Sequence, residues 1–344
     1  MPAMILPNAG DLHISWQKEL GQSFTHPEQL LDYLGLDPTP WQQGLAARKL
    51  FAMRVPRPFA DKMRPGDPSD PLLRQVLPLN EEFAQVPGFV TDPLEEHDSA
   101  LPGLLHKYRS RVLLVLRGGC AVNCRYCFRR HFPYADNSPG QSGWQPAVNY
   151  IAAHPEINEV ILSGGDPLMA KDHHIAALLS ELEAIPHLRR LRIHSRLPVV
   201  IPARLTEELR ERLNQSRLRP VLVLHVNHAN EIDDDMARRL QGWQRAGITL
   251  LNQSVLLAGV NDNADVLEAL SERLFEAGVL PYYLHQLDKV AGAAHFAVSD
   301  EQARALMAQL LARLPGFLVP RLVREVGGEV SKTPLDLHLE PVKE

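Results

Sequence analysis

The sequence predicts an α/β protein built on a parallel sheet, and two observations predict it. From residue 111 onward, short apolar runs rich in β-branched residues alternate with segments of helical spacing, one pair about every 30 residues. Each apolar run is followed by polar side chains that are capable of chemistry. The predicted strands are residues 112–116, 160–162, 191–194, 221–226, 249–251 and 282–284.

Helices are predicted between these strands, at residues 146–153, 173–184, 206–213, 233–246 and 265–277. Six strand–helix units in one run could close, or partly close, into a barrel. A doubly wound open sheet is the rival arrangement. The alternation of strands and helices leaves both arrangements open at this point.

The chain before and after the alternating region has a different character. Residues 1–105 are proline-rich, with helical spacing at 41–55 and a turn-rich connector at 63–76. We therefore expect a mainly helical extension over residues 1–105 that packs on the barrel, the barrel itself over 106–300, and a C-terminal helix and short segment over 301–344.

Polar residues gather where the predicted strands end. Cysteines follow the first strand, and Ser163-Gly164-Gly165-Asp166 follows the second. His194-Ser195-Arg196 follows the third strand, and the later strands are followed by residues 225–231, 252–254 and 285–289. Loops after strands are commonly polar, but six in succession favour a shared pocket at the carboxyl face of a barrel.

Composition bounds the class of protein. The formal net charge of −5 argues against nucleic acid as a main partner, because phosphate binding needs a basic footprint. The first residues show no signal peptide, and no apolar run approaches the ~20 residues that span a bilayer. We therefore expect a cytoplasmic protein without a membrane partner.

All three cysteines of the 344-residue chain lie in the stretch CAVNCRYC at residues 120–127. Such a cluster in a reducing compartment holds metal or performs redox chemistry more often than it forms disulfides. Cys120, Cys124 and Cys127 can bind a [4Fe–4S] cluster, and three thiolates leave one iron open for a substrate or cofactor, whereas electron-transfer clusters use four.

Two other interpretations of the cysteines stay open at this point. Zinc could be bound by the three thiolates together with His131, as a closed Cys3His site in an interaction module. The cysteines could also be buried as small apolar side chains without any ligand.

The stretch CAVNCRYCFRRHF resembles the lysine 2,3-aminomutase family of the radical S-adenosylmethionine (SAM) superfamily. The same resemblance extends to HKYRSRVLLVL, SGGDPL, SRLPVVIPAR, HVNHANEI, LLNQSVLLAGVND, PYYLHQLDKVAGAAHF and GGEVSKTPLDL, which together cover most of residues 65–337. Within the family the chain is most similar to the bacterial aminomutases that serve the (R)-β-lysylation of translation elongation factor P.

The resemblance implies a partial (β/α)6 barrel, an open-iron [4Fe–4S] cluster on the three cysteines and SAM bound at that iron. Gly164, Gly165 and Asp166 match the element that meets the SAM amino group. Further contacts to SAM or to a second cofactor are expected from the following strand ends, at Ser195, Arg196, His225 and Gln253.

The second cofactor implied is pyridoxal 5′-phosphate (PLP), which needs one lysine for its resting link to the enzyme. Lys332 matches the family's PLP lysine, because it stands in a glycine-rich segment before Thr-Pro. Arg111, with Tyr108 and His106 beside it, is expected to hold the PLP phosphate. Without the resemblance, we would interpret Lys332 as a solvated lysine in a C-terminal loop.

Three further positions match the family's substrate contacts. Arg129 corresponds to the arginine that pairs with the substrate α-carboxylate, a task suited to a guanidinium fork. Asp288 and Glu325 correspond to the acids that hold the side-chain ammonium. The second acid is aspartate in the lysine-fermenting enzymes, so the longer arm of Glu325 is expected to alter substrate placement.

The activity implied is conversion of L-α-lysine to β-lysine by migration of the amino group from C2 to C3, through a PLP aldimine and a 5′-deoxyadenosyl radical. The implied partners are an electron donor such as flavodoxin or ferredoxin and the ligase that modifies elongation factor P. Because no cysteine lies outside residues 120–127, we expect no zinc between subunits and a monomer or weak dimer. An aminomutase for another amino acid, or a SAM enzyme that has lost PLP, are the alternatives.

Overall fold

The computed structural model describes residues 15–97, 101–134, 137, 143–329 and 331–339, and its strands form one sheet in sequence order. The predicted absence of a signal peptide concerns residues that lie outside this part of the chain. The strands are β1 (Leu104–Tyr108), β2 (Arg111–Arg117), β3 (Glu159–Gly164), β4 (Arg190–Ser195), β5 (Arg219–Leu224), β6 (Thr249–Val255), β7 (Leu280–His285), β8 (Arg321–Arg324) and β9 (Thr333–Pro334).

Strands β2 to β8 pair in parallel, whereas β1 and β9 add antiparallel edges. The six predicted strands correspond to β2 to β7. The sequence analysis missed β1, β8 and β9. Within the described residues β1 and β9 do not pair with one another, so the sheet forms a partial barrel and the predicted fold class is confirmed.

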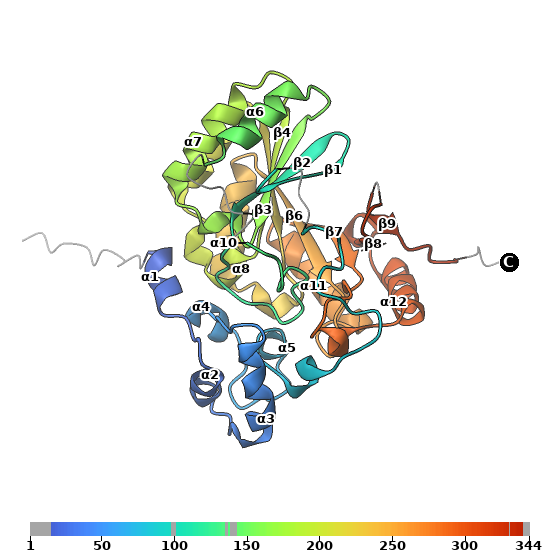
Figure 1. Cartoon of the computed structure of the whole chain (residues 1–344). Helices are drawn as coiled ribbons and strands as arrows, with labels where there is room; N and C mark the ends of the chain where they lie inside the picture. Colours follow the sequence, from blue (N-terminus) through green and yellow to red (C-terminus); the bar gives the residue numbers. More distant parts are fainter. Residues whose placement is uncertain (1–14, 98–100, 135–136, 138–142, 330, 340–344) are drawn as a thin grey trace, which may run out of the picture.

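Helices connect the successive parallel strands, as parallel pairing requires. They are α6 (Gln145–Ala153), α7 (Asp172–Glu183), α8 (Leu197–Val200), α9 (Glu207–Asn214), α10 (Asp234–Arg245), α11 (Ala264–Glu276) and α12 (Asp300–Arg313). Side chains of Thr206, Asp233, Asn263 and Ser299 cap the free N–H groups at four of their amino ends. These helices lie along the outside of the sheet in Figure 1.

The N-terminal part of the chain forms short helices at one end of the strands, drawn in blue in Figure 1. They are α1 (Trp16–Gly21), α2 (Pro27–Tyr33), α3 (Gln42–Leu45), α4 (Arg57–Ala60) and α5 (Pro71–Arg74). Helical spacing at 41–55 yields only α3 and a 3₁₀ turn on each side. Beyond the second 3₁₀ turn, the carbonyls of Phe51 and Ala52 accept hydrogen bonds from the Arg125 and Asn123 side chains rather than from a continuing helix.

One apolar core joins the extension to the barrel. It contains Trp16, Leu30 and Phe59 from the extension together with β-sheet and helix residues as far as Val279. A second cluster, around α11 and α12, includes Leu284 and closes the last units. The three domain ranges given above stay predictions. No helix in the described part of the chain has the length and apolar character needed to cross a membrane.

Candidate active site

The three cysteines lie in the loop that follows β2, at the carboxyl end of the strand. All three are free and half-buried. Burial raises the pKa of the Cys120 thiol, and the nearby Cys127, Asp166 and Cys124 raise it further. The thiols are therefore electrostatic neighbours, as the ligands of one group must be.

The arrangement differs from that of a single-ion site. A zinc ion needs its ligands at ~2.0–2.3 Å from one point, and no group of three or more His, Cys, Asp or Glu in the described ranges is gathered in that way. In a cubane cluster each thiolate binds a different iron. The ring of His131, the fourth ligand of the alternative zinc site, contacts the Ala291 carbonyl at 3.3 Å.

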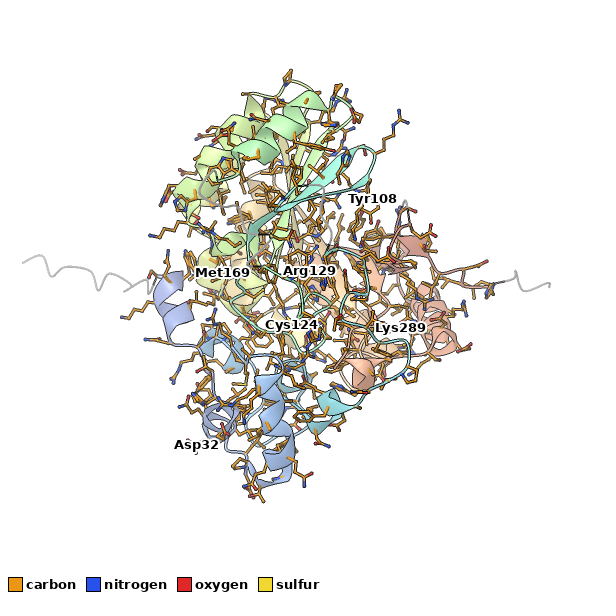
Figure 2. The ribbon with its side chains drawn as sticks, in the orientation of Figure 1. Asp32, Tyr108, Cys124, Arg129, Met169 and Lys289 are labelled. Atoms are coloured by element: carbon orange, nitrogen blue, oxygen red, sulfur yellow. The ribbon has the colours of Figure 1, made fainter. Side chains whose placement is uncertain are left out.

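The N-terminal extension holds the cysteine loop through its backbone. Arg54 Nη1 donates to the Cys120 carbonyl at 2.9 Å, and the Asn123 amide donates to the Arg54 carbonyl at 3.1 Å. The Arg125 amide donates to the Gln75 carbonyl at 2.9 Å. Cys124 lies toward the blue helices in Figure 2, on the side of the extension. The extension thus fixes the path of the loop between its first and last cysteine.

A buried ion cluster fixes the same loop through side chains. Glu82 accepts from Arg125 Nε at 2.8 Å and Arg125 Nη2 at 2.5 Å, and from Arg130 Nη2 at 2.8 Å. The Glu82 and Arg125 side chains are fully buried. Two cations on either side of Cys127 therefore share one carboxylate from the extension. Sequence reasoning missed this cluster, because Glu82 stands in an ordinary acidic run.

The glycines before the cysteines pack against the glycines after β3. A Cβ atom on Gly165 would lie 2.6 Å from the Gly119 carbonyl oxygen, and Gly164 has a φ of 120° that disfavours other residues. The Asp166 amide donates to the Gly119 carbonyl at 3.0 Å. This close approach needs glycine, so the Gly164-Gly165 pair supports the start of the cysteine loop whatever ligand it also meets.

Asp166 is buried and its carboxylate is already well supplied with donors. It accepts from the Leu168 amide at 2.9 Å, from Ser195 Oγ at 2.8 Å, and from the amides of Arg196 and Leu197 at 2.9 Å each. These bonds tie the end of β3 to the end of β4. A contact of Asp166 with the SAM ammonium stays a prediction.

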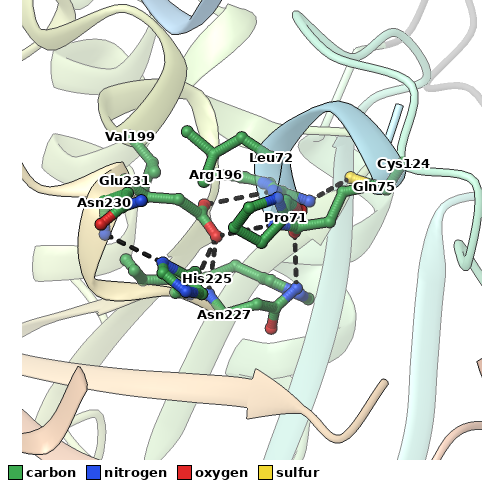
Figure 3. A network of polar contacts seen from close by, with 12 residues as sticks. Pro71, Leu72, Gln75, Cys124, Arg196, Val199, His225, Asn227, Asn230 and Glu231 are labelled. Carbon is green, nitrogen blue, oxygen red and sulfur yellow. Dashed lines mark hydrogen bonds and ion pairs between the residues drawn. The ribbon is translucent and has the colours of Figure 1, made fainter. Parts of the chain in front are cut away.

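Arg196 belongs to a polar network beside the cysteines (Figure 3). Its Nη1 donates to Cys124 Sγ at 2.8 Å and also to Tyr126 Oη, and its Nη2 donates to Gln75 Oε1 at 2.7 Å and Glu231 Oε2 at 3.2 Å. The ring of His225 stacks on that of Tyr126 at 5.7 Å. Arg196 and His225, both predicted cofactor contacts, are thus brought to the cysteine loop.

The strands present a polar face to the inside of the barrel. Along β6 and β4, fully buried residues on the outer face alternate with half-buried residues, which include Gln253 and His194. Two histidine nitrogens on this side, His194 Nε2 and His285 Nε2, are buried without a hydrogen-bond partner in the described structure. Unpartnered buried polar atoms are costly. These two nitrogens are therefore available to bond polar atoms of a ligand.

Lys332 points into the same interior. The Gly327-Gly328 turn lets β9 fold back on β8, pairing Thr333 with Arg324, and this brings Lys332 beside Glu325. Lys332 Nζ forms an ion pair with Glu325, whose Oε1 accepts from Tyr108 Oη at 3.2 Å. Burial, followed by the charge of Lys332, lowers the pKa of His285 well below its usual value. The neighbouring histidine is therefore neutral beside the lysine.

Asp288 lies in reach of the same charges. Burial raises its pKa to about 7, with a further rise from Glu325, while Lys332 acts in the opposite direction. A buried carboxyl with such a pKa lacks a full counter-ion. The two acids predicted to hold an ammonium are thus electrostatic neighbours of one another and of Lys332.

Arg129 also lies in the barrel interior, but most N–H groups of its guanidinium already donate to other residues of the protein. Its Nε and Nη2 donate to the two oxygens of Glu96 at 2.7 and 3.2 Å, and its Nη1 donates to Ser163 Oγ at 3.0 Å. In Figure 2 it lies on the strand side of Cys124. Neither Glu96 nor its second partner Lys107 was a predicted site residue. Lys107 lies in the stretch HKYRSRVLLVL without being singled out there, and Glu96 lies outside the quoted motifs.

The predicted PLP-phosphate contacts fall into two groups. Arg111 stands at the amino end of β2, opposite the cysteine end, with its guanidinium 3.9 Å from the Tyr108 ring centroid. Tyr108 links this position to Glu325 and Lys332. His106 instead bonds the Tyr150 hydroxyl at 2.9 Å on the helix side. The structure therefore places Arg111 and Tyr108 with the lysine, and His106 away from it.

Comparison with known proteins agrees with this site. A family model described as "4Fe-4S single cluster domain" matches residues 109–190, which include all three cysteines. The Escherichia coli K12 protein "L-lysine 2,3-aminomutase" is 60% identical over 94% of this chain and 95% of its own length. The protein of the same name from Haemophilus influenzae is 55% identical over 93% and 95%.

A more distant relative carries the same name. The "L-lysine 2,3-aminomutase" of Clostridium subterminale is 35% identical over 93% of this chain and 77% of its own length. A solved structure described as "Native anSMEcpe with bound AdoMet and Cp18Cys peptide" matches with a TM-score of 0.46 and 11% identity over 67% of this chain and 74% of that one, a likeness too low to carry an argument. The partial barrel and its cysteine loop define a radical SAM protein. The chain belongs to the lysine 2,3-aminomutase family of isomerases.

Proposed function

We propose that this protein converts L-lysine to β-lysine by moving the amino group from C2 to C3. The observation that carries the proposal is the placement of Asp288 and Glu325 around Lys332, in a barrel interior that also holds Arg129. Acids at one end and a guanidinium at the other suit the side-chain ammonium and the carboxylate of lysine. The names of the relatives support the same substrate.

The residues fit the expected cofactors. Cys120, Cys124 and Cys127 would hold a [4Fe–4S] cluster that binds SAM, and Lys332 would hold PLP, with Arg111 near its phosphate. When bound, these groups supply the radical that removes hydrogen from the β-carbon and the carbon centre that carries the migrating nitrogen. The unpartnered nitrogens of His194 and His285 are available to polar atoms of the ligands.

The chain's own residues bind and orient the substrate. Lys332 neutralises Glu325 in the present structure. If Lys332 held PLP, its ammonium would no longer neutralise Glu325, and Glu325 and Asp288 would be available to hold the ε-ammonium of the substrate. Burial, followed by the charge of Arg196, lowers the pKa of His225 to about 3, so this histidine adds no competing positive charge near the cysteines.

The wider setting of the reaction is part of the proposal. We propose that the product is used for β-lysylation of elongation factor P, through the ligase that performs it, and that flavodoxin or ferredoxin supplies electrons. The resemblance of the chain to the β-lysylation aminomutases supports this use. A cytoplasmic monomer or weak dimer is expected, because the chain has no cysteines outside residues 120–127 for a zinc between subunits.

The test is direct. Protein reconstituted anaerobically with iron, sulfide, PLP and SAM, then reduced, is incubated with isotopically labelled L-lysine, and the amino acids are separated. We expect labelled β-lysine, none in a Cys124→Ala control, and no product from L-glutamate. A fully loaded protein that consumes SAM but returns only α-lysine would contradict the proposed function.

A further inference from the structure

Arg129 is the group expected to recognise the substrate carboxylate, yet most of its donors are used within the protein. A guanidinium has five N–H donors. Arg129 Nε and one N–H of Nη2 donate to Glu96, and Nη1 donates to Ser163 Oγ at 3.0 Å and the Gly164 carbonyl at 3.3 Å. One N–H, on Nη2, is left. Bidentate recognition of a second carboxylate is therefore not available while Glu96 stays in place.

Glu96 is itself held firmly. Lys107 Nζ donates to Glu96 Oε1 at 3.0 Å and to the Leu94 carbonyl at 2.9 Å. The amide of Glu96 donates to Asp92 Oδ1 at 3.0 Å. Glu96 is only 4% exposed. Although burial opposes its ionisation, Arg129 and Lys107 lower the pKa of Glu96 to about 2. Glu96 is thus a permanent buried anion.

The segment that carries Glu96 crosses the mouth of the barrel. Val90 exchanges backbone hydrogen bonds of 2.9 Å with Lys289 and Ala291, directly after Asp288. Glu95 packs against Gly327 on the turn that leads to Lys332, where a Cβ atom would lie 2.9 Å from the Glu95 side chain. The same segment therefore touches the acid end, the lysine turn and the arginine end of the site.

The charges at the arginine end balance in a specific way. Arg129 and Lys107 bring two positive charges and Glu96 brings one negative charge, so one net positive charge remains. An amino-acid substrate brings one carboxylate to it. Arg129 is close enough to Asp288 to influence its ionisation, which places both ends in one space.

We propose that Glu96 is a positioning and specificity-determining residue: together with Lys107 it clamps Arg129, leaving a single N–H and a single net positive charge for the α-carboxylate of the substrate. The inference rests on the proposed function, since it assigns the remaining N–H of Arg129, on Nη2, to recognition of the lysine carboxylate. It differs from a purely structural role because its effect depends on whether the ligand has a carboxylate.

The test compares L-lysine with cadaverine, which has both amino groups but no carboxylate. Both are titrated calorimetrically into cluster- and PLP-loaded protein without reductant, so that no turnover occurs, and KM and kcat for lysine are measured separately. For Glu96→Gln we expect about tenfold weaker lysine binding and a matching rise in KM, with cadaverine affinity unchanged within about twofold. Glu156→Gln, which changes an exposed carboxylate on the turn before β3, should match wild type.

Other outcomes would overturn the inference. Tighter lysine binding in Glu96→Gln would mean that Glu96 competes with the substrate, and equal losses for both ligands would mean a structural role. If Glu96→Gln does not fold, Glu96→Asp can be used, because it keeps the charge on a shorter side chain. Glu96→Asp should weaken lysine binding by less than about tenfold and leave cadaverine binding unchanged. Unchanged lysine binding in Glu96→Asp would refute the inference. Failure of the proposed function is separate, because wild-type protein would then form no β-lysine.

Discussion

Glu82→Gln removes the one carboxylate that Arg125 and Arg130 share beneath the cysteine loop. The amide keeps the shape of the side chain but supplies only one acceptor oxygen, and its NH2 group faces arginine donors. Both guanidinium groups are within 2.8 Å of Glu82 and almost fully buried. The substitution therefore leaves two buried cations without a counter-ion, on either side of Cys127.

Removing one partner of a buried ion pair costs about 3–5 kcal/mol. With about 2.1 cal/mol/K of unfolding entropy per residue, a chain of 344 residues shifts its melting temperature by roughly 1.4 °C for each kcal/mol, so we expect Glu82→Gln to melt about 4–7 °C below wild type. The loop that carries the cysteines is the part directly loosened. Bound iron per chain should therefore fall, by about half or more, in protein that is still folded at room temperature.

The assay is an anaerobic thermal melt followed by circular dichroism, with iron and sulfide measured on the same samples. Glu81→Gln is the matched control, because Glu81 is the exposed neighbour. Adding Arg125→Met to Glu82→Gln should recover part of the loss, since it also removes an unpaired charge. If Glu82→Gln melts within about 1 °C of Glu81→Gln and holds equal iron, the extension does not support the cluster loop.

Three further predictions concern the proposed chemistry. Cys124→Ala should abolish reductive SAM cleavage and lower bound iron while the far-ultraviolet circular dichroism stays unchanged. Lys332→Ala should lose PLP trapped by borohydride, measured by mass spectrometry, yet keep the iron signal. The affinity for lysine should fall about tenfold per pH unit below about pH 6, because the pKa of Asp288 is raised to about 7 and its carboxyl must lose a proton before it can bind the ammonium. Calorimetry of Asp288→Asn should show lysine binding that is weaker by ~1–3 kcal/mol and independent of pH in this range.

The barrel could be predicted because its signal is local. Strands β2 to β7 are short apolar runs, and the helices between them have regular spacing, so both periods are visible in the sequence. Strand β8 was missed because it is short and half its residues are not fully buried. Strand β1 was missed because its residues fall across the predicted boundary between the helical extension and the barrel, and β9 because it has only two residues.

The site was predictable to the extent that it rests on motifs. The cysteine spacing and the glycine-rich segment before Lys332 are sequence patterns, and each is placed at the barrel interior. The residues that hold the cysteine loop and Arg129 in place belong to no recognisable sequence motif. Glu82 and Glu96 reach their arginines across 43 and 33 residues of sequence, and such pairings depend on how the extension folds over the loop. A single sequence carries no signal for them.

The same distances bear on substrate choice. Glu325 is anchored by Tyr108 Oη, a contact that does not depend on Lys332. Its carboxylate would therefore keep its place if Lys332 held PLP, and the longer arm of glutamate reaches Tyr108. Burial, followed by the charge of Glu325, raises the pKa of Asp288. If both acids face the substrate side chain, as proposed, an acidic side chain would add a third negative charge there, and we expect the site to reject glutamate by repulsion as well as to favour lysine by attraction.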